Sequence, residues 1–387
     1  KGKDIRKENI SENRTKKKAE KRKPKQAKYQ DTHFSSKPKI DVNKVSLKKK
    51  IELCEDYFKK VQASDKDIIN TRVALVESHE EKIFVGPNKC LSQIITGCRM
   101  LVMPFVKAHD GSVRYHYESY FRPGLEVEKV MAMNLNHAIM MTKKIRDAKK
   151  IKPGKYLAIL SPHVTGLLAH ESFGHGMEAD TMYKDRARAR EYLGKKIAPR
   201  HVDIIDNPAY PERNGSFFFD DEGQISAPTS LIEKGIVRQP ITDKRHAALL
   251  GMPRSANGRC ESFDHKSYAR MTNTYFDAGK DSVKAMVKSI KNGLFLHYSA
   301  GGMEDPKGWG VQIQGIVAER IKNGKLTGDV FYEVGLSGFL PTILSNIKQV
   351  SREFMIEGTG ICGKGHNEWV RVSEGGPFLK IKDLPLS

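Results

Sequence analysis

The chain lacks the long apolar run that a membrane-spanning helix needs. Such a helix takes about 20 consecutive apolar residues. The longest apolar runs here, RMLVMPFV (99–106) and YLAIL (156–160), are much shorter. Fixed-period repeats are also absent from the sequence. We therefore expect a soluble protein without a membrane partner.

Cysteine is scarce, and no two cysteines form a C-x-x-C pair. The five cysteines are odd in number, which does not suit a disulfide framework and fits a reducing compartment. We therefore expect a cytoplasmic location. An initial methionine is missing as well, and we interpret the chain as a processed or truncated piece of a longer protein.

Acidic residues are outnumbered, with 46 Asp and Glu against 67 Lys and Arg, a net charge of +21. Residues 1–50 hold 19 of the basic and 6 of the acidic residues, which accounts for +13 and leaves +8 for the rest. We interpret residues 1–40 as a solvated basic arm or linker that the chemistry does not need. An RNA-associated protein is an alternative, but charge alone gives only non-specific attraction, so nucleic acid is not the expected partner.

Apolar periodicity divides the remaining chain near residue 150. One helical stripe predicts an amphipathic helix from about residue 46, with lysines on its outer face. This stripe consists of Leu47, Ile51, Cys54, Phe58 and Val61. Strand-like runs follow, and residues 126–149 return to helical spacing. Residues 41–150 are therefore expected to form an α+β domain.

Residues 151–387 alternate strand-like runs with glycine turns. Asn323-Gly324, for example, lies between two such runs and is a strong signal for a β-hairpin. We expect a β-rich second domain with a few helices. The fold class of the whole chain is therefore predicted to be α+β.

Two histidines flank a glutamate in LLAHESFGHGME (167–178). In the zinc-protease signature H-E-x-x-H the histidines are four apart on one face of a helix. His170 and His175 are five apart, which on a regular helix is about 140°. A π-type turn would bring them to within about 50° of each other, and Gly174 tolerates such an irregularity. We predict this turn around Phe173 and Gly174, with both imidazoles on one metal ion.

The alternative is that the two histidines are merely packed or solvent-facing. The apolar segment before them argues against it, because a charged Glu171 in its continuation is costly to bury without a task. Two histidines still leave a tetrahedral metal short of a third protein ligand. Cys362 in GICGKG is a candidate, since a thiolate is a soft ligand for zinc; a histidine such as His366 or a carboxylate is the alternative.

The segment GTGICGKG (358–365) also partly matches a phosphate-binding loop. Gly365, however, stands where a Ser or Thr would hold magnesium. The following residues also look like a strand, whereas phosphate binding needs a helix N-terminus there. We therefore do not expect nucleotide binding.

Five ordered motifs resemble those of the TldD/PmbA family of metallopeptidases. They are GLLAHESFGHGMEAD, DDEG, NGRCESF, RMTNTYFDAG and CGKG, and the resemblance covers about residues 45–383. It implies a TldD-type subunit, the type that carries the H-E-x-x-x-H signature. The implied fold is an α+β N-terminal part, incomplete in this chain, and a β-rich catalytic part. The implied partners are short or unfolded peptides and a second subunit, in a homodimer or a heterodimer with a PmbA-type protein.

Carried over position by position, the family's metal ligands fall on His170, His175 and Cys362, and its glutamate falls on Glu171. We expect one Zn²⁺ ion on the three ligands, with Glu171 as the general base for a metal-activated water. Candidates for a donor to the oxyanion are His265, Tyr268 and Arg270. The family usually reads C-G-K-x-G-Q where residues 362–367 read CGKGHN, a departure in this loop. The alternative function is a non-catalytic peptide-binding subunit with a structural metal site.

Overall fold

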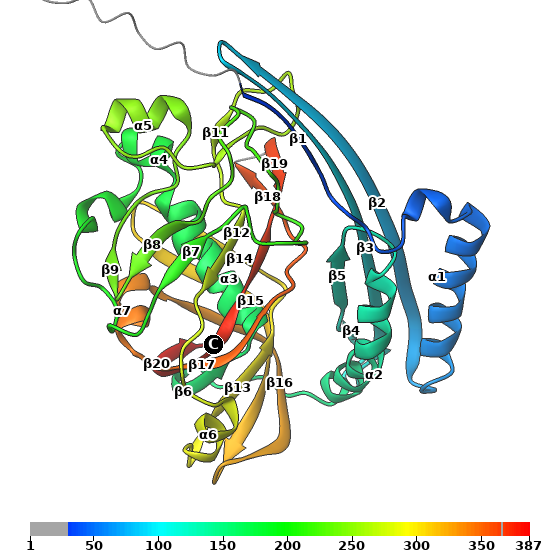
Figure 1. The fold of residues 1–387 in the computed structure, drawn as a ribbon. Helices are drawn as coiled ribbons and strands as arrows, with labels where there is room; N and C mark the ends of the chain where they lie inside the picture. Colours follow the sequence, from blue (N-terminus) through cyan, green and yellow to red (C-terminus); the bar gives the residue numbers. More distant parts are fainter. Residues whose placement is uncertain (1–29, 365–366) are drawn as a thin grey trace, which may run out of the picture.

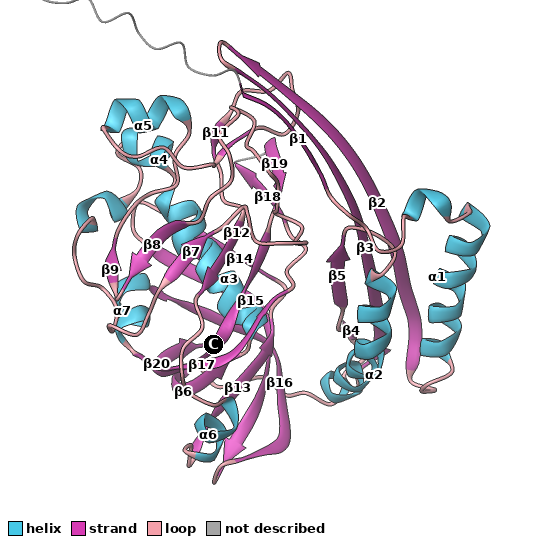
Figure 2. Ribbon diagram, viewed as in Figure 1, coloured by secondary structure: helices cyan, strands magenta, loops and turns pink. Residues whose placement is uncertain are grey.

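The computed structural model describes residues 30–364 and 367–387 (Figure 1). Strands predominate, and the helices lie at the periphery except for α3, which runs through the larger part of the molecule (Figure 2). The predicted α+β class is confirmed. Across the described ranges, no helix combines the length and the apolar character needed to span a membrane.

The N-terminal part is a strongly curved sheet with two helices. Its strands are β1 (Gln30–Ser35), β2 (Ile68–Gly86), β3 (Lys89–Lys107), β4 (Val113–Tyr115) and β5 (Glu118–Arg122), and its helices are α1 (Leu47–Gln62) and α2 (Val127–Arg146). The order is β1-β3-β2, with β4 and β5 also paired to β3. β2 and β3 form one long hairpin that reaches over the larger part of the molecule (Figure 1).

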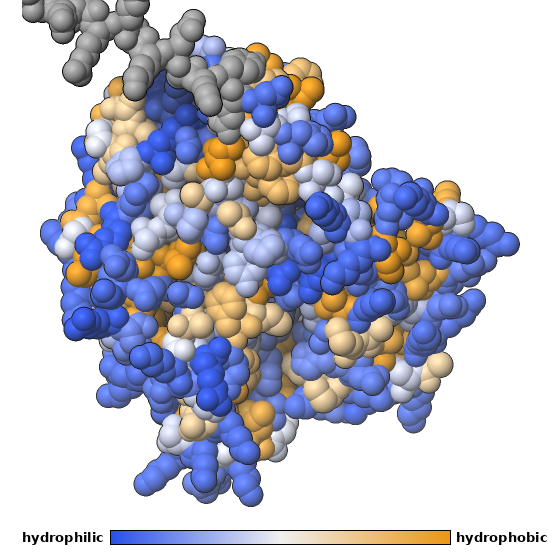
Figure 3. All heavy atoms as spheres, in the orientation of Figure 1, coloured by the Kyte–Doolittle hydropathy of each residue, from blue (hydrophilic) through white to orange (hydrophobic). Residues whose placement is uncertain are grey.

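Helix α1 forms where the periodicity predicted it, but the predicted buried face is wrong. Three of the predicted core residues are exposed: Leu47 (71%), Ile51 (51%) and Phe58 (41%). Val61 of the predicted stripe is buried as expected, but it packs with α2 and the sheet together with Tyr57, which lies outside that stripe. The helix carries two apolar stripes, and only the one with Tyr57 covers the sheet. Figure 3 shows apolar residues at the surface in the region of α1.

The basic arm ends earlier than predicted. Residues 30–35, which we assigned to the arm, form β1 and pair in parallel with β3, from Gln30 opposite Lys89 to Ser35 opposite Ile94. Phe34 supplies an apolar anchor there, because its ring stacks on Phe218 with centroids 5.1 Å apart. Residues 1–29 lie outside the described ranges, so the solvated arm stays a prediction for them.

The C-terminal part is built on an eleven-stranded sheet. Its strands are β6 (Gly154–Leu160), β7 (Ile204–Asp206), β8 (Thr229–Glu233), β9 (Ile236–Val237), β12 (Asn273–Phe276), β13 (Asn292–Tyr298), β14 (Gly301–Asp305), β15 (Gly310–Lys322), β16 (Lys325–Phe339), β17 (Ile347–Ile356) and β20 (Ser373–Leu386). Two small hairpins pair β10 (Gly258–Arg259) with β11 (Tyr268–Ala269) and β18 (Ile361–Lys364) with β19 (Asn367–Arg371). Asn323-Gly324 connects β15 and β16 with both residues at positive φ, so the predicted hairpin is confirmed.

Short helices connect these strands. They are α3 (Pro162–Ala169), α4 (Ala179–Tyr183), α5 (Lys244–Leu250), α6 (Val283–Lys288) and α7 (Leu340–Ser345). Helix α3 follows β6 and is buried along most of its length. It packs directly on β20. The two backbones are so close that a methyl group added at Gly166 would lie only 2.6 Å from Cα of Gly375. This close approach fixes where the end of α3 delivers the residues that follow it.

We expect Gly166→Ala to destabilise the protein. The added methyl must push α3 away from the β20 backbone, and such overpacking costs about 1–3 kcal/mol, or roughly 2–10 °C in Tm. Thermal unfolding followed by circular dichroism measures the effect. Gly154→Ala is the matched control, because its methyl meets atoms at an ordinary 3.5 Å. Equal Tm values for the two variants would contradict the close packing.

Candidate metal centre

Helix α3 runs into a π turn, His170–Gly174, and then into a 3-10 turn, His175–Met177. The backbone N–H of His175 donates to the carbonyl of His170, five residues earlier. The irregularity predicted around Phe173 and Gly174 is therefore confirmed. It turns the two imidazoles toward each other, with ring centroids 5.3 Å apart.

Cys362 lies on β18, which folds back onto this turn. Its Sγ is 3.0 Å from Nε2 of His175. Potential ligand atoms of His170, His175 and Cys362 all lie within 4.8 Å of one another. The structure thus brings the three predicted ligands together across 187 positions of sequence. His366, the alternative histidine ligand, lies outside the described residues.

Electrostatics couples the thiol to the imidazoles. Burial raises the pKa of Cys362, but His170 and His175 outweigh it and lower that pKa to about 5. Burial lowers the pKa of His170, but Cys362 outweighs it and raises that pKa to about 9. The thiol is therefore held as a thiolate, which is the form that binds metals.

The donor set fits a zinc ion. Two imidazoles and a thiolate are common zinc ligands, and three protein ligands leave one tetrahedral position open. His170 Nδ1 adds an independent sign, since it is buried and has no hydrogen-bond partner among the residues that the structure describes. Buried nitrogens of this kind are rarely left unpaired.

Glu171 lines a cavity of about 510 Å³ together with the three predicted ligands. Gly302 of β14 makes room for it, because a methyl group there would lie 2.8 Å from Cγ of Glu171. Glu304, also on β14, approaches Glu171 and His175 to within 4.8 Å. Burial raises the pKa of Glu304 to about 8, opposed by His175 and reinforced by Glu171. The carboxyl groups of Glu304 and Glu171 thus line the same part of the cavity.

Glu178 and Lys364 support the site from behind His175. Glu178 is buried, and its Oε1 lies 3.6 Å from His175 Nδ1. Its other oxygen is 2.9 Å from Nζ of Lys364. A carboxylate in this position orients a ligating imidazole. We did not predict Glu178 or Lys364 from the sequence; the one available signal was a carboxylate three residues after His175, which alone is weak.

Of the three predicted oxyanion donors, only Arg270 contacts one of the predicted ligands, Cys362. Its guanidinium is fully buried, with Nη2 3.2 Å from Sγ of Cys362 and Nε 3.2 Å from Glu178. His265 lies 3.5 Å from Glu368, and the ring of Tyr268 lies beneath Lys364. None of the three predicted donors, Arg270 included, belongs to the described lining of the cavity.

Comparisons with known proteins agree on one family. Residues 153–387 match the model described as the PmbA/TldA metallopeptidase C-terminal domain. A metalloprotease of Methanocaldococcus jannaschii is 30% identical over 346 residues, which covers 88% of this chain and 75% of that protein. A zinc metalloprotease TldD homolog of Saccharolobus solfataricus is 33% identical over 241 residues, covering 60% of this chain and 52% of that protein.

A solved structure shares the fold. TldE from Thermococcus kodakarensis aligns with a TM-score of 0.72 at 16% sequence identity. The alignment covers 93% of this chain and 79% of that one. The predicted resemblance is thus confirmed by sequence and by fold. The chain belongs to the PmbA/TldD family of metallopeptidases.

Proposed function

We propose that this protein is a zinc-dependent peptidase that hydrolyses short or unfolded peptides, with residues 151–387 as its catalytic domain. The observation that carries the proposal is the convergence of His170, His175 and Cys362 beside Glu171 in one cavity. The relatives named metalloproteases support it at the level of the family.

His170, His175 and Cys362 would hold one zinc ion. When bound, zinc supplies a Lewis acid that lowers the pKa of a bound water toward about 7. Arg270 is a positioning residue in this proposal, because its nitrogens hold Cys362 and Glu178. Glu178 in turn keeps the ring of His175 oriented.

Glu171 acts as the general base. It accepts the proton of the attacking water and passes it to the leaving amine. Glu304 lies beside it and lines the same cavity. Peptide hydrolysis requires a general base such as this carboxylate at the cavity wall. A metal site with a purely structural role would not require one.

We also propose that the chain works as a dimer, with a second copy or with a PmbA-type subunit. β2 is an edge strand of 19 residues, and within the described ranges only β3 pairs with it. Several large apolar side chains of β2 are exposed: Ile69, Val76, Ile83 and Val85. A long uncovered edge of this kind is a liability for a monomer, and a partner subunit would cover it.

The five cysteines are unpaired, which supports a reducing cytoplasm.

We expect chelation to abolish peptide hydrolysis. Purified protein should contain one zinc ion per chain, measured by inductively coupled plasma mass spectrometry. Treatment with a chelator should remove both the zinc and the turnover of a short fluorogenic peptide, and added zinc should restore both. Full turnover by metal-free protein would contradict the proposed function.

A further inference from the structure

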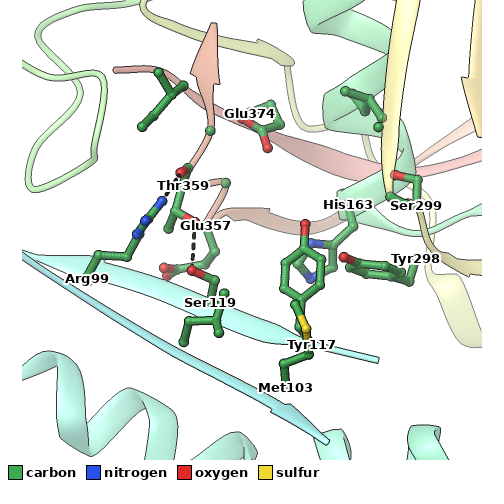
Figure 4. A pocket seen from close by; sticks show the side chains of 17 residues that line it. Arg99, Met103, Tyr117, Ser119, His163, Tyr298, Ser299, Glu357, Thr359 and Glu374 are labelled. Atoms are coloured by element: carbon green, nitrogen blue, oxygen red, sulfur yellow. Dashed lines mark hydrogen bonds between the residues drawn. The ribbon is translucent and has the colours of Figure 1, made fainter. Parts of the chain in front are cut away.

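A second cavity, of about 380 Å³, lies beside the candidate metal centre (Figure 4). It opens between the curved N-terminal sheet and the elements that carry the metal site. Leu167, three residues before His170, lines it on one side, and Ile361, directly before Cys362, lines it on another. A peptide held at the metal centre would therefore have a neighbouring side chain within reach of this cavity.

Apolar and aromatic groups form most of its walls. Leu101 and Met103 come from β3, and Leu167 from α3. The rings of Tyr117 and Tyr298 pack edge to face, with centroids 4.9 Å apart. Walls of this kind bind the apolar body of a ligand, and a few polar groups then select its chemistry.

The polar group that stands out is Glu374 on β20. Figure 4 shows its carboxylate pointing into the cavity, toward the same space as the hydroxyl of Tyr117. Gly358 makes room for it, because a methyl group there would lie 2.5 Å from Oε1 of Glu374. Burial raises the pKa of Glu374 to about 7, opposed by His170 and reinforced by Glu171 and Cys362.

The other acidic residue of the lining, Glu357, is paired with an arginine, whereas the cation Arg99 contacts only a neutral carbonyl group among the described residues. Glu357 accepts two hydrogen bonds from Arg122, at 2.7 and 2.8 Å. Arg99 donates to the carbonyl of Thr359 at 3.3 Å. For Glu374, no described side chain supplies an ion pair or a hydrogen bond. The cavity thus presents one acidic group that a ligand can satisfy.

Tyr298 offers a second polar group to a ligand in this cavity. The residue is only 6% exposed, and its hydroxyl is buried without a hydrogen-bond partner in the part of the chain that the structure describes. A buried hydroxyl left unpaired is costly. Tyr117 remains a neutral phenol, because burial raises its pKa to about 12. Both hydroxyls can accept hydrogen bonds from a cationic group.

We propose that this cavity receives a lysine or arginine side chain of the peptide substrate, with Glu374 as its counter-ion. The proposal rests on the peptidase function proposed above and names its substrate class. The aliphatic stem of the basic side chain packs against the rings of Tyr117 and Tyr298 and against Leu101 and Leu167, as such stems commonly do. The charged end reaches Glu374. The amino terminus of a peptide is also cationic, but it has no aliphatic stem and would leave these apolar walls unfilled.

The test compares two peptides that differ at one position next to the scissile bond, lysine in one and norleucine in the other. Norleucine keeps the stem and removes the charge. Wild-type protein should favour the lysine peptide in kcat/KM by roughly ten- to hundredfold, the range of a charge-assisted hydrogen bond. In Glu374→Gln this ratio should fall to about one. In Glu374→Arg the preference should pass to a peptide with glutamate at the same position.

Glu233→Gln is the control, because it removes an exposed carboxylate that is not part of the described cavity lining. Its ratio should match that of wild type. A lysine preference that survives Glu374→Gln, or equal kcat/KM for both peptides in wild type, would overturn the assignment. If no peptide is cleaved at all, the proposed function fails, and fluorescence anisotropy of the same labelled peptides still decides whether Glu374 selects lysine.

Discussion

Glu171→Gln should lower kcat for peptide hydrolysis by roughly 10²- to 10⁴-fold and leave the metal bound, because an amide of the same shape cannot accept the proton of the attacking water. Glu171 lies in the same cavity as the three metal ligands without being one of them in the proposed set. The measurement pairs steady-state kinetics on one short peptide with the zinc content of the same preparation. Circular dichroism shows whether the fold is retained.

Glu191→Gln is a matched control, since Glu191 is a glutamate whose side chain is 68% exposed. It should keep wild-type kcat and zinc content. Wild-type turnover in Glu171→Gln would remove the general base from the mechanism. Loss of zinc together with activity would instead favour the other ligand set at this site, formed by Glu171, His175 and Glu304.

Cys362→Ser should lose zinc and activity together, with metal affinity lower by more than about 100-fold, because a serine hydroxyl is not ionised at neutral pH and replaces a thiolate ligand. Cys54→Ser, in α1 and remote from the site, should keep both. Metal titration measures the affinity. Iodoacetamide labelling followed by mass spectrometry adds a second readout, since a metal-bound thiolate resists alkylation until the metal is removed.

The other cysteines provide internal references for the labelling. Burial raises the pKa of Cys98 and of Cys260 to about 12, so both should react slowly with or without metal. Cys362, with its pKa lowered to about 5, should react at neutral pH only in metal-free protein. Equal labelling of Cys362 in both states would exclude it as the third ligand and would point to His366 or a carboxylate.

The π turn could be predicted from sequence because the constraint is local. Two histidines five residues apart can share an ion only if the helix gains a residue per turn, and Gly174 marks where it does. Cys362 required the family resemblance, because spacing carries no information over 187 positions. Glu304 could not be predicted, since its relation to His175 depends on how β14 returns to the turn. Glu178, three residues after His175, had only a weak local signal.

In the fold, too, local features could be predicted from the sequence and long-range contacts could not. The hairpin at Asn323-Gly324 was predictable from its own two residues and their neighbours. The buried face of α1 was not, because both stripes of that helix are apolar and the sheet selects the one with Tyr57. β1 was missed because it has little apolar periodicity and is held by β3, a strand far along the chain.

The ligands of the candidate metal centre come from distant parts of the chain, with β18 folded back onto the end of α3. A bound ion would therefore act as a cross-link that closes a very long loop, and cross-links of this kind restrict the unfolded chain most. Stability would then rise with the concentration of free zinc. Under zinc starvation the chain would lose this cross-link, unfold more readily and become more exposed to cellular proteases.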